Sequence, residues 1–420
     1  MSRLWMRLDN AALIFPAVRR REWVNCFRVS ATIKDDIDPV LLQRAVDDLK
    51  PRFPSMYVRL GSGIFWYFLE EVDRPPQVRE DYAYPLTHMG SRELHTCAFR
   101  VLYYKNRIAV EIFHSLTDGT GGSIYLKTLA ARYVELRYGV EVPAENGVLD
   151  YRDSPTPEEL EDSFLKYSGK FSMSRSERNS WRLRGTRVPD NFLHVITGIV
   201  DTDELLAVAH GYGCTVTAFL SAVMAETIIG MQAEKVPLKS QKPVKISVAV
   251  NLRKLFPSKT LRNFALVLNP GVDPRLGEYT LAELCREFSH QLAGENTRQK
   301  MAARIAANVK TQQTIALRLA PLFLKNLALK MVYDSVGEKK GCLNISNLGP
   351  ILMPEIMSEF VSRIEFIIGV QISYFNNCSV ATYGNTTCIN MIRSIKETEL
   401  ERRFFSRLVE LGVAVTIESN

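Results

Sequence analysis

The sequence lacks the features that mark several common protein classes. Its seven cysteines are odd in number and scattered, without a CxxC pair or a Cys/His metal spacing, so we expect free thiols in a reducing compartment and no structural zinc. Glycine and proline, at 23 and 19 residues of 420, are too few for a collagenous or low-complexity chain. The P-loop, the G-x-G-x-x-G fingerprint and H-E-x-x-H are also absent, which leaves nucleotide hydrolysis, dinucleotide binding and zinc peptidase chemistry without support.

A long uncharged hydrophobic run is missing too. The most apolar window, Ile315 to Tyr333, contains three Lys or Arg residues and a proline, whereas a membrane-spanning helix needs about 20 nearly uncharged residues. We therefore expect no transmembrane segment and interpret this window as a helix packed in a core. The first apolar stretch follows an acidic residue and precedes three arginines, the wrong order for a secretory signal. We expect a cytoplasmic protein that starts at Met1.

The charge balance is mildly basic. Lys and Arg total 53 against 46 Asp and Glu, a net charge of +7, and 46% of the residues are hydrophobic, as in ordinary globular proteins. This excess suits anionic ligands such as phosphates or a membrane surface. It is too diffuse to indicate nucleic acid, and no basic helix with interleaved aromatics is present. We therefore expect no nucleic-acid partner.

Hydrophobic periodicity in the first half predicts alternating strands and helices. Every second residue from Phe27 to Ile33 is apolar, as on a half-buried strand. Asp38-Pro39 then supplies an N-cap and a helix-opening proline for the next apolar run. Further elements are expected as strand pairs within 56–72 and 94–113 and as a helix over Ser123–Tyr138 that Gly139 closes.

A change of composition divides the chain. Between about 140 and 190 the periodicity fades and prolines accumulate among charges, as in a connecting region. We therefore predict an N-terminal subdomain over 1–185 and a C-terminal subdomain over 186–420, both mixed α/β. The second half should contain strands at 192–200, 244–250, 263–269 and 342–346, a strand pair within 366–392, and helices at 202–212, 215–232, 280–333 and 397–411.

The stretch most informative about chemistry is Ile108 to Gly122, IAVEIFHSLTDGTGG. Alternate residues of its strand form an apolar face, and by the same two-residue period His114 continues that face at the strand's end. Apolar surroundings disfavour the charged imidazole, so we expect His114 to be neutral near pH 7 and able to act as a general base. Asp118 lies where the chain turns, and Gly119 lets the backbone bend or approach a ligand closely.

A lone histidine on an apolar face is more often a satisfied core residue, and that alternative stays open. Two observations favour the functional interpretation of His114. The pattern H-x-x-x-D-G is rare by chance in a chain with only 6 His and 23 Gly residues. It also lies where a strand opens into a glycine-rich turn and a helix.

The motif resembles HxxxD of the chloramphenicol acetyltransferase-like superfamily, which includes nonribosomal-peptide condensation domains, alcohol acetyltransferases and lipid-forming acyltransferases. The resemblance spans nearly the whole chain, because the helices, hairpins and strand before His114 come in the family's order. It implies an α/β fold of two chloramphenicol acetyltransferase-like subdomains, with mixed sheets flanked by helices, that meet at a central cleft or tunnel. The condensation branch carries HHxxxDG, and this chain departs from it with Phe113. The DFGWG motif of the plant BAHD branch is absent.

Two further stretches match the family in order. SVAVNLR, ending at Arg253, looks like the strand whose arginine pairs with the motif aspartate in condensation-type enzymes. The resemblance therefore implies an ion pair between Asp118 and Arg253; the alternative is an Arg253 on an exposed strand end. ISNLG, with Ser346, is similar to a strand of the dihydrolipoyl acyltransferase branch in which a serine hydroxyl stabilises the oxyanion. The alternative is that this stretch only turns the chain.

The resemblance implies acyl transfer. A thioester donor, either acyl-CoA or acyl-phosphopantetheine on a carrier protein, would meet a small-molecule or lipid alcohol at His114, with no permanently bound cofactor and no metal. Helices within 280–333 would either wall a channel for the acyl chain or form ordinary core. We expect a monomer. Two alternatives remain: a stand-alone condensation-type amide or ester synthase fed by a carrier protein, and a non-catalytic binding module on the same fold.

Overall fold

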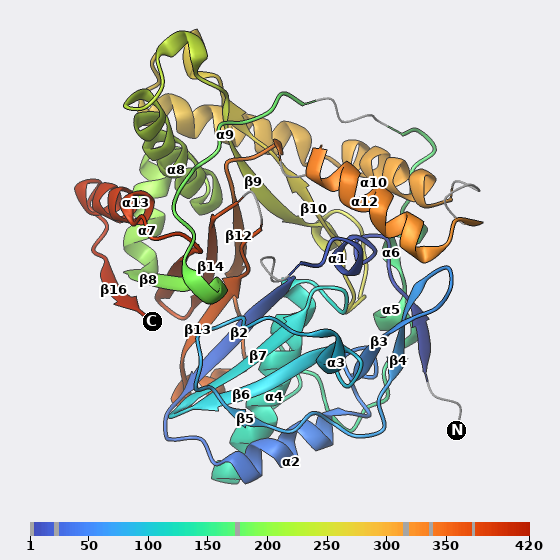
Figure 1. Cartoon of the computed structure of the whole chain (residues 1–420). Helices are drawn as coiled ribbons and strands as arrows, with labels where there is room; N and C mark the ends of the chain where they lie inside the picture. The colour runs from blue at the N-terminus through green and yellow to red at the C-terminus, as the bar shows by residue number, and fades with distance from the viewer. Residues whose placement is uncertain (1–3, 21–24, 173–176, 314–318, 336–338, 372–373) are drawn as a thin grey trace.

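Two β-sheets, each covered by helices, build the two lobes of the molecule (Figure 1). The computed structural model describes residues 4–20, 25–172, 177–313, 319–335, 339–371 and 374–420. The sheet of the first lobe has the strand order β13-β2-β7-β6-β5. Its strands are β2 (Cys26–Ile33), β5 (Arg79–Glu80), β6 (Phe99–Tyr104), β7 (Arg107–Phe113) and β13 (Val361–Ile368).

The helices α2 (Pro39–Leu49) and α4 (Gly119–Tyr138) pack against each other in the first lobe, and α4 also contacts β2. Asp38 caps α2, because its carboxylate accepts hydrogen bonds from the amides of Val40 and Leu41. A second, small sheet has the order β1-β4-β3 and consists of β1 (Trp5–Arg7), β3 (Val58–Ser62) and β4 (Tyr67–Glu71). Short helices connect these parts: α1 (Ile14–Ala17), α3 (Ser91–Leu94), α5 (Pro157–Leu160) and α6 (Ser163–Lys166).

The sheet of the second lobe has the order β10-β9-β12-β14-β15-β8-β16, with β11 paired to β9. Its strands are β8 (His194–Asp201), β9 (Val244–Asn251), β10 (Ala265–Leu268), β11 (Gly271–Val272), β12 (Leu343–Pro350), β14 (Asn376–Tyr383), β15 (Thr386–Arg393) and β16 (Thr416–Ser419). Its helices are α7 (Thr202–Gly211), α8 (Val216–Ala233), α9 (Leu281–Glu295) and α13 (Glu399–Glu410). The helices α10 (Arg298–Gln313) and α12 (Leu322–Ser335) also come from the second half of the chain, but α10 contacts α6 and α12 contacts α1.

Of the helices that the structure describes, α8 alone is long and apolar enough to cross a membrane, judged by length and composition only. Of this helix, 67% is buried inside the protein. It packs between α9, α13 and the sheet of the second lobe. Burial on several sides accounts for its apolar composition, since a helix that is hydrophobic all round is found in protein cores as well as in membranes.

Strand β13 joins the two halves of the chain. It pairs antiparallel with β2 from Val361 opposite Ile33 to Ile368 opposite Phe27, so a strand from the second half completes the sheet of the first lobe. Its hydrophobic residues Ile364 and Phe366 belong to the core of that lobe. The subdomain boundary at 185/186 stays a prediction of where the chain passes between the lobes.

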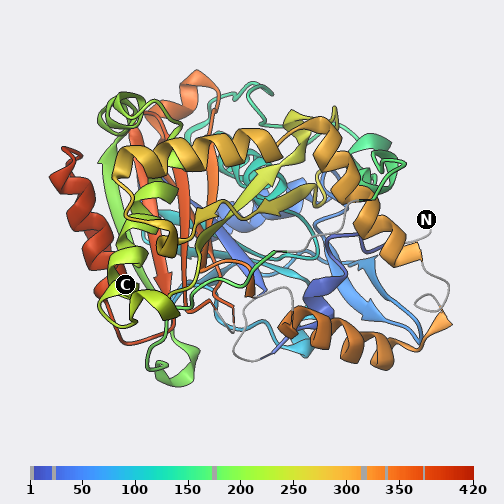
Figure 2. The same cartoon turned by 90° about the horizontal axis from the view of Figure 1, so that it is seen from above.

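Most expected elements are present, with one correction. The strand pairs within 56–72 and 94–113, the helix that Gly139 closes and the helices at 202–212 and 215–232 all form, although α4 begins at Gly119 rather than at Ser123. The apolar window 315–333 is not packed in a core: Phe323 and Leu327 of α12 point into solvent, and residues 314–318 lie outside the described part. Seen from above, α12 lies on the outside of the molecule beside the strands β3 and β4 (Figure 2).

Candidate functional site

The motif lies where β7 ends and α4 begins. Asp118 is the N-cap of α4, and its Oδ1 accepts hydrogen bonds from the amides of Thr120 and Gly121, both at 3.1 Å. These amides would otherwise have no partner in the first turn of the helix. The same residue therefore ends the connection after His114 and fixes the start of α4.

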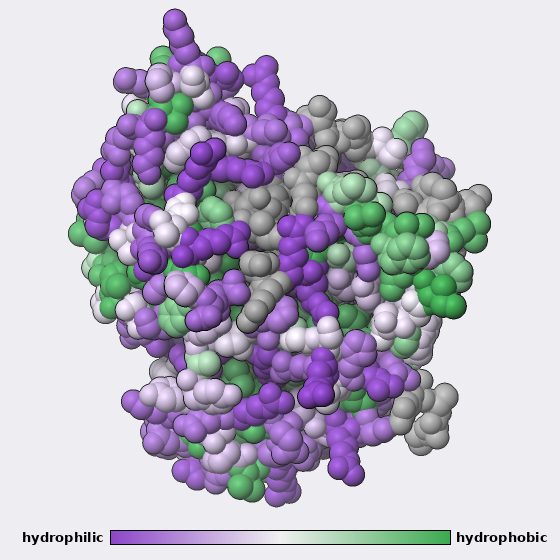
Figure 3. All heavy atoms as spheres, viewed as in Figure 1, coloured by the Kyte–Doolittle hydropathy of each residue, from purple (hydrophilic) through white to green (hydrophobic). Residues whose placement is uncertain are grey.

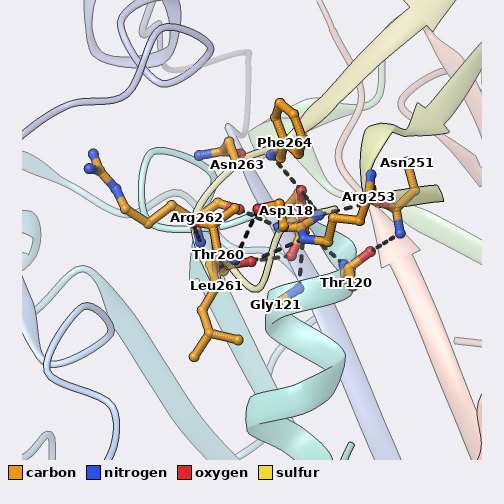
Figure 4. Close-up of polar contacts among 12 residues, drawn as sticks. Asp118, Thr120, Gly121, Asn251, Arg253, Thr260, Leu261, Arg262, Asn263 and Phe264 are labelled. Atoms are coloured by element: carbon orange, nitrogen blue, oxygen red, sulfur yellow. Dashed lines mark hydrogen bonds and ion pairs between the residues drawn. The ribbon is translucent and has the colours of Figure 1, made fainter. Parts of the chain in front are cut away.

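The second carboxylate oxygen of Asp118 connects the two halves of the chain. Oδ2 accepts hydrogen bonds from Arg253 Nη1 and from the amide of Phe264, each at 2.8 Å. Figure 4 shows Arg253 reaching Asp118 from the right, beside β9, and Phe264 lying above the carboxylate. Both side chains of the ion pair are largely buried, with exposures of 12% and 6%. The ion pair that the resemblance implied is confirmed.

Arg253 uses most of its N–H donors within the protein, and besides Asp118 its Nη1 also donates to Asn251 Oδ1 at 3.3 Å. Its Nε donates to the carbonyl of Thr260 at 3.0 Å, and its Nη2 donates to the carbonyl of Arg262 at 2.6 Å. The guanidinium thus fixes the loop between β9 and β10 onto Asp118. A planar group with several N–H donors suits this bridging position, and the arrangement gives Asp118 and Arg253 a structural role.

His114 is held between two aromatic rings. Its imidazole stacks on Phe15 of α1, with ring centroids 4.4 Å apart, and meets the edge of Phe27 at 5.2 Å. Its amide donates to the carbonyl of Asn25 at 2.9 Å, and the side chain of Asn25 donates to the carbonyl of Phe15 at 2.9 Å. The orientation of the ring is therefore fixed from both sides.

Asn263 determines which nitrogen of His114 carries the hydrogen. Its Nδ2 donates to the carbonyl of His114 at 3.0 Å and to Asp9 Oδ2 at 3.2 Å. Both acceptors require the amide nitrogen on that side, so the oxygen Oδ1 faces His114 Nδ1, 3.1 Å away. Nδ1 must therefore be the donor, and Nε2 is left unprotonated in the neutral ring. This is the tautomer that a general base at Nε2 requires.

Burial also favours the neutral form of the His114 imidazole. Desolvation lowers the pKa of His114 below its ordinary value of 6.5, against the opposing effects of backbone hydrogen bonds, of the charge of Asp118 and of the hydrogen bond with Asn263. The ring is consequently neutral near pH 7. This agrees with the expectation from its place at the end of an apolar strand.

A cavity of about 1000 Å³ opens beside His114, between the two lobes. Asp118 and Gly119 line it from the first lobe, and Ser346 lines it from β12 of the second. The remaining lining residues come mainly from β9, β12, the ends of α8 and α9 and the loop before α8, and they include the cationic Lys254. On the opposite flank, Phe15 covers the imidazole.

Gly119 permits the close approach of the lobes at the cavity. A Cβ atom at this position would lie 2.6 Å from Leu348 Cδ2 and 3.3 Å from Phe366 Cζ. These two side chains come from β12 of the second lobe and from β13 of the first lobe's sheet, so a larger residue at 119 would force Leu348 or Phe366 to shift. The role of Gly119 is therefore steric.

Four of the five residues predicted from the sequence, His114, Asp118, Gly119 and Ser346, line one cavity, while Arg253 stands behind it and acts on Asp118. Sequence reasoning missed Asn263 and Asp9. An isolated asparagine carries no charge pattern or spacing that marks it, so only the fold reveals that it faces His114. The seven cysteines are free and buried, and among the described residues no cluster of His, Cys, Asp or Glu could hold a metal ion.

No protein-family model matches the sequence, and comparison with curated protein sequences found no match. Solved structures match over nearly the full length. TRI101 of F. graminearum, solved with coenzyme A and T-2 mycotoxin, has a TM-score of 0.65 at 8% identity over 99% of both chains. Polyketide synthase associated protein 5 from Mycobacterium tuberculosis has a TM-score of 0.58 at 14% identity over 96% of both chains.

The first condensation domain of the CDA synthetase gives a TM-score of 0.60 at 14% identity, over 98% of this chain and 99% of that one. At such low identities the likeness concerns the fold alone. These matches, together with the two lobes and the cavity between them, confirm the fold class that the resemblance implied. The chain has the two-lobed α/β fold that these acetyltransferase and condensation-domain structures share.

Proposed function

We propose that this protein transfers an acyl group from a thioester donor to an alcohol, with His114 as the general base. The observation that carries the proposal is the hydrogen-bond chain from Asp9 through Asn263 to His114 Nδ1. It leaves an unprotonated Nε2 on a ring that lines a cavity of about 1000 Å³. A histidine that only fills the core would not need a cavity beside it.

In the proposed reaction, His114 Nε2 accepts the proton of the acceptor hydroxyl as its oxygen attacks the thioester carbonyl carbon. The new C–O bond forms, and the resulting tetrahedral oxyanion collapses with cleavage of the C–S bond. The imidazolium returns the proton to the leaving thiolate, so the products are an ester and a free thiol. No covalent acyl-enzyme is required, and the histidine ends in its starting state.

Ser346 is the candidate donor to the oxyanion. It lines the same cavity as His114 but on the strand β12 of the opposite lobe, as expected of a group that faces the reacting carbonyl from the side opposite the base. A hydroxyl donor in such a position contributes about 10²–10³-fold in known cases. The alternative, that this stretch only turns the chain, is less favoured because Ser346 lies inside the strand.

The donor is proposed to be acyl-CoA. Lys254 and the loop before α8 border the cavity, and a cation there suits the phosphates of coenzyme A. TRI101, a structural neighbour, was solved with coenzyme A bound. An acyl chain on a carrier protein remains the second candidate, because condensation domains share the fold.

The test is the release of free thiol from a panel of acyl-CoAs in the presence of alcohols. The His114→Ala variant should lose about 10²–10⁴-fold in rate, the contribution of a positioned base. His194→Ala, which alters a histidine outside the cavity, is the matched control and should keep the wild-type rate. Equal rates for His114→Ala and the wild type would refute the proposal.

The same assay separates the candidate donors. Saturable turnover with acyl-CoA alone assigns the acyl-CoA-dependent transferase. Turnover that appears only with an acylated carrier protein assigns the condensation-type synthase. Tight binding of acyl thioesters without turnover would instead indicate a binding module.

A further inference from the structure

The outer face of α12 is apolar, although it points into solvent. Phe323, Leu327 and Met331 are spaced by four residues, so they form one stripe along the helix. Their exposures are 70%, 54% and 58%. A surface helix ordinarily presents polar residues to solvent and apolar residues to the core. The stripe on α12 reverses this arrangement.

The tip of the β3–β4 hairpin continues the stripe. Ile64, Phe65 and Trp66 are exposed there, Ile64 by 74%. Three hydrogen bonds tie the tip and β4 to α12: the amide of Leu322 donates to the carbonyl of Ile64, Lys325 Nζ to the carbonyl of Phe65, and Asn326 Nδ2 to Tyr67 Oη, each at 2.8 Å.

We call the six exposed apolar residues the docking face: Ile64, Phe65, Trp66, Phe323, Leu327 and Met331. Figure 3 shows hydrophobic side chains gathered at the right edge of the molecule, where Figure 1 places α12 and the hairpin. Exposed apolar clusters of this kind mark interaction surfaces rather than ordinary protein surface.

Positive charge accompanies the docking face. The cations of Lys325 and Arg7 lie over the ring of Trp66, at 4.1 and 5.9 Å from its centroid. Two lysines, Lys325 and Lys330, lie on α12 itself, whose one acidic residue is Asp334. The nearby acids Glu70 and Glu71 are paired with Arg59 and Lys50.

The combination of exposed apolar side chains and positive charge complements the surface of a lipid bilayer. Aliphatic and phenyl side chains enter the acyl region, a tryptophan ring favours the interface, and lysines and arginines meet anionic headgroups. A partner protein would be expected to match the face with a more mixed polar surface. The charge complementarity therefore favours an anionic bilayer.

A pocket lies behind the docking face. It has a volume of about 670 Å³, and it is lined by Gly61 to Ile64 of the hairpin, Leu322 and Phe323 of α12, and Pro16 of α1. Pro16 follows Phe15, whose ring stacks on His114. The short helix α1 is thus the wall between this pocket and the imidazole, on the flank opposite the large cavity.

We propose that the docking face binds the surface of an anionic lipid bilayer and that the pocket behind it receives a membrane-borne alcohol for acylation at His114. The second half of this statement rests on the proposed function; the first half does not. The two substrates would then reach His114 from opposite flanks, the thioester through the large cavity and the lipid alcohol past α1.

The first experiment measures binding without turnover. The full chain is sedimented with vesicles of phosphatidylcholine alone and of phosphatidylcholine mixed with phosphatidylglycerol. We expect binding to the mixed vesicles and much less to the neutral ones. Added salt should weaken the binding, because it screens the attraction between lysines and anionic headgroups.

Two variants locate the binding surface. In the double variant Phe323→Ser/Leu327→Ser, the vesicle partition coefficient should fall by about tenfold or more, since two apolar groups no longer enter the bilayer. Lys330→Glu should weaken binding to anionic vesicles by about fivefold or more. The control is Leu238→Ser/Leu276→Ser, which alters two exposed leucines away from the docking face and should bind like the wild type. All of these side chains are largely or partly exposed, and circular dichroism confirms that each variant is folded.

Three outcomes would overturn the inference. The first is the absence of vesicle binding by the wild type, and the second is equal binding by the wild type and Phe323→Ser/Leu327→Ser. The third is a concentration-dependent dimer, or a complex with an acidic carrier protein, that the same double variant abolishes. Thiol release with a water-soluble alcohol in the absence of vesicles tests the proposed function separately, so failure of one proposal is distinguishable from failure of the other.

Discussion

At the scale of single residues, Asn263 orients the candidate base His114, although nothing in the sequence marks it as functional. It donates to Asp9 and to the carbonyl of His114, so its amide orientation is determined by two acceptors. Asp9 is fully buried, and desolvation raises the pKa of its carboxyl to about 6. The carboxylate is therefore available as an acceptor at neutral pH. We regard Asn263 as a positioning residue that acts through His114.

The Asn263→Leu variant tests this role. The loss of the fixed tautomer should lower kcat by up to about 10²–10⁴-fold, the full contribution of a positioned base, with a smaller change in KM. The hydrogen bond with Asn263 raises the pKa of His114, so its removal should lower that pKa. The neutral base then persists to lower pH, and the acid limb of the kcat/KM profile should move to lower pH than in the wild type.

Steady-state kinetics over a pH series measures both effects, and ¹⁵N shifts of His114 report the tautomer directly. The control is Asn269→Ala, an asparagine just beyond β10 that does not contact His114. If Asn263→Leu lowered kcat and left both the acid limb and the tautomer unchanged, Asn263 would have only a general structural role.

At the scale of elements, the start of α4 depends on one carboxylate with four hydrogen bonds. Two come from the helix's own amides and two from Arg253 and the amide of Phe264. A buried carboxylate that loses its cation retains the full cost of desolvation. The structure therefore predicts that the ion pair matters far more for stability than its surface counterparts do.

Arg253→Met should lower the free energy of unfolding by about 3–5 kcal/mol, as when one partner of a buried pair is removed. The matched control is Arg152→Met. Arg152 pairs with Asp150 at the same distance of 2.8 Å but is 67% exposed, so its loss should change the free energy of unfolding little, because water screens surface ion pairs. Urea denaturation measures both values. Similar costs for the two variants would contradict the structural role assigned to Arg253.

Elements set by local signals were predictable, and elements set by distant contacts were not. The hairpin around 105–106 and the helix closed by Gly139 follow from turn and cap residues that act locally. The short strands β1 and β16 depend on partners far along the chain, β4 and β8, and their sequences carry no signal of their own. The exposed stripe of α12 was misread as core, because hydrophobicity alone does not show which surface covers a helix.

The same distinction holds for the residues of the candidate site: those with a local sequence pattern were predictable, and those brought together by the fold were not. His114, Asp118 and Gly119 lie within six residues and form a recognisable pattern. Arg253 and Ser346 were predicted only because the resemblance to a known family supplied their roles. Asn263 and Phe15 contact His114 from two distant segments, and Asp9, from the same segment as Phe15, contacts Asn263. Nothing in the local sequence of these residues indicates that they meet.

At the scale of the whole molecule, the two lobes share their structural elements. Strand β13 belongs to the second half of the chain and completes the first lobe's sheet, while Asp118 of the first half holds the loop after β9. Neither lobe has its complete hydrogen-bonding network without the other. We therefore expect the lobes to unfold together, although the chain is long enough for two domains.

The Ile364→Ala variant tests this cooperativity. Ile364 lies on β13 and is 1% exposed, so its truncation should cost about 2–5 kcal/mol. Scanning calorimetry should show one endotherm for the wild type and one endotherm at lower temperature for the variant. Two separable endotherms, of which only one moves, would show that the lobes unfold independently.

The cytoplasmic location and the monomeric state stay predictions.

The place of β13 also has a consequence for synthesis on the ribosome. The chain emerges from its N-terminus, so β2 and β7 are available long before residues 361–368 have been translated. Until then one edge of β2 has no neighbour, and an open strand edge is a template for pairing with other chains. The nascent protein must therefore keep this edge protected through most of its translation, and the first lobe is completed only when synthesis is nearly finished.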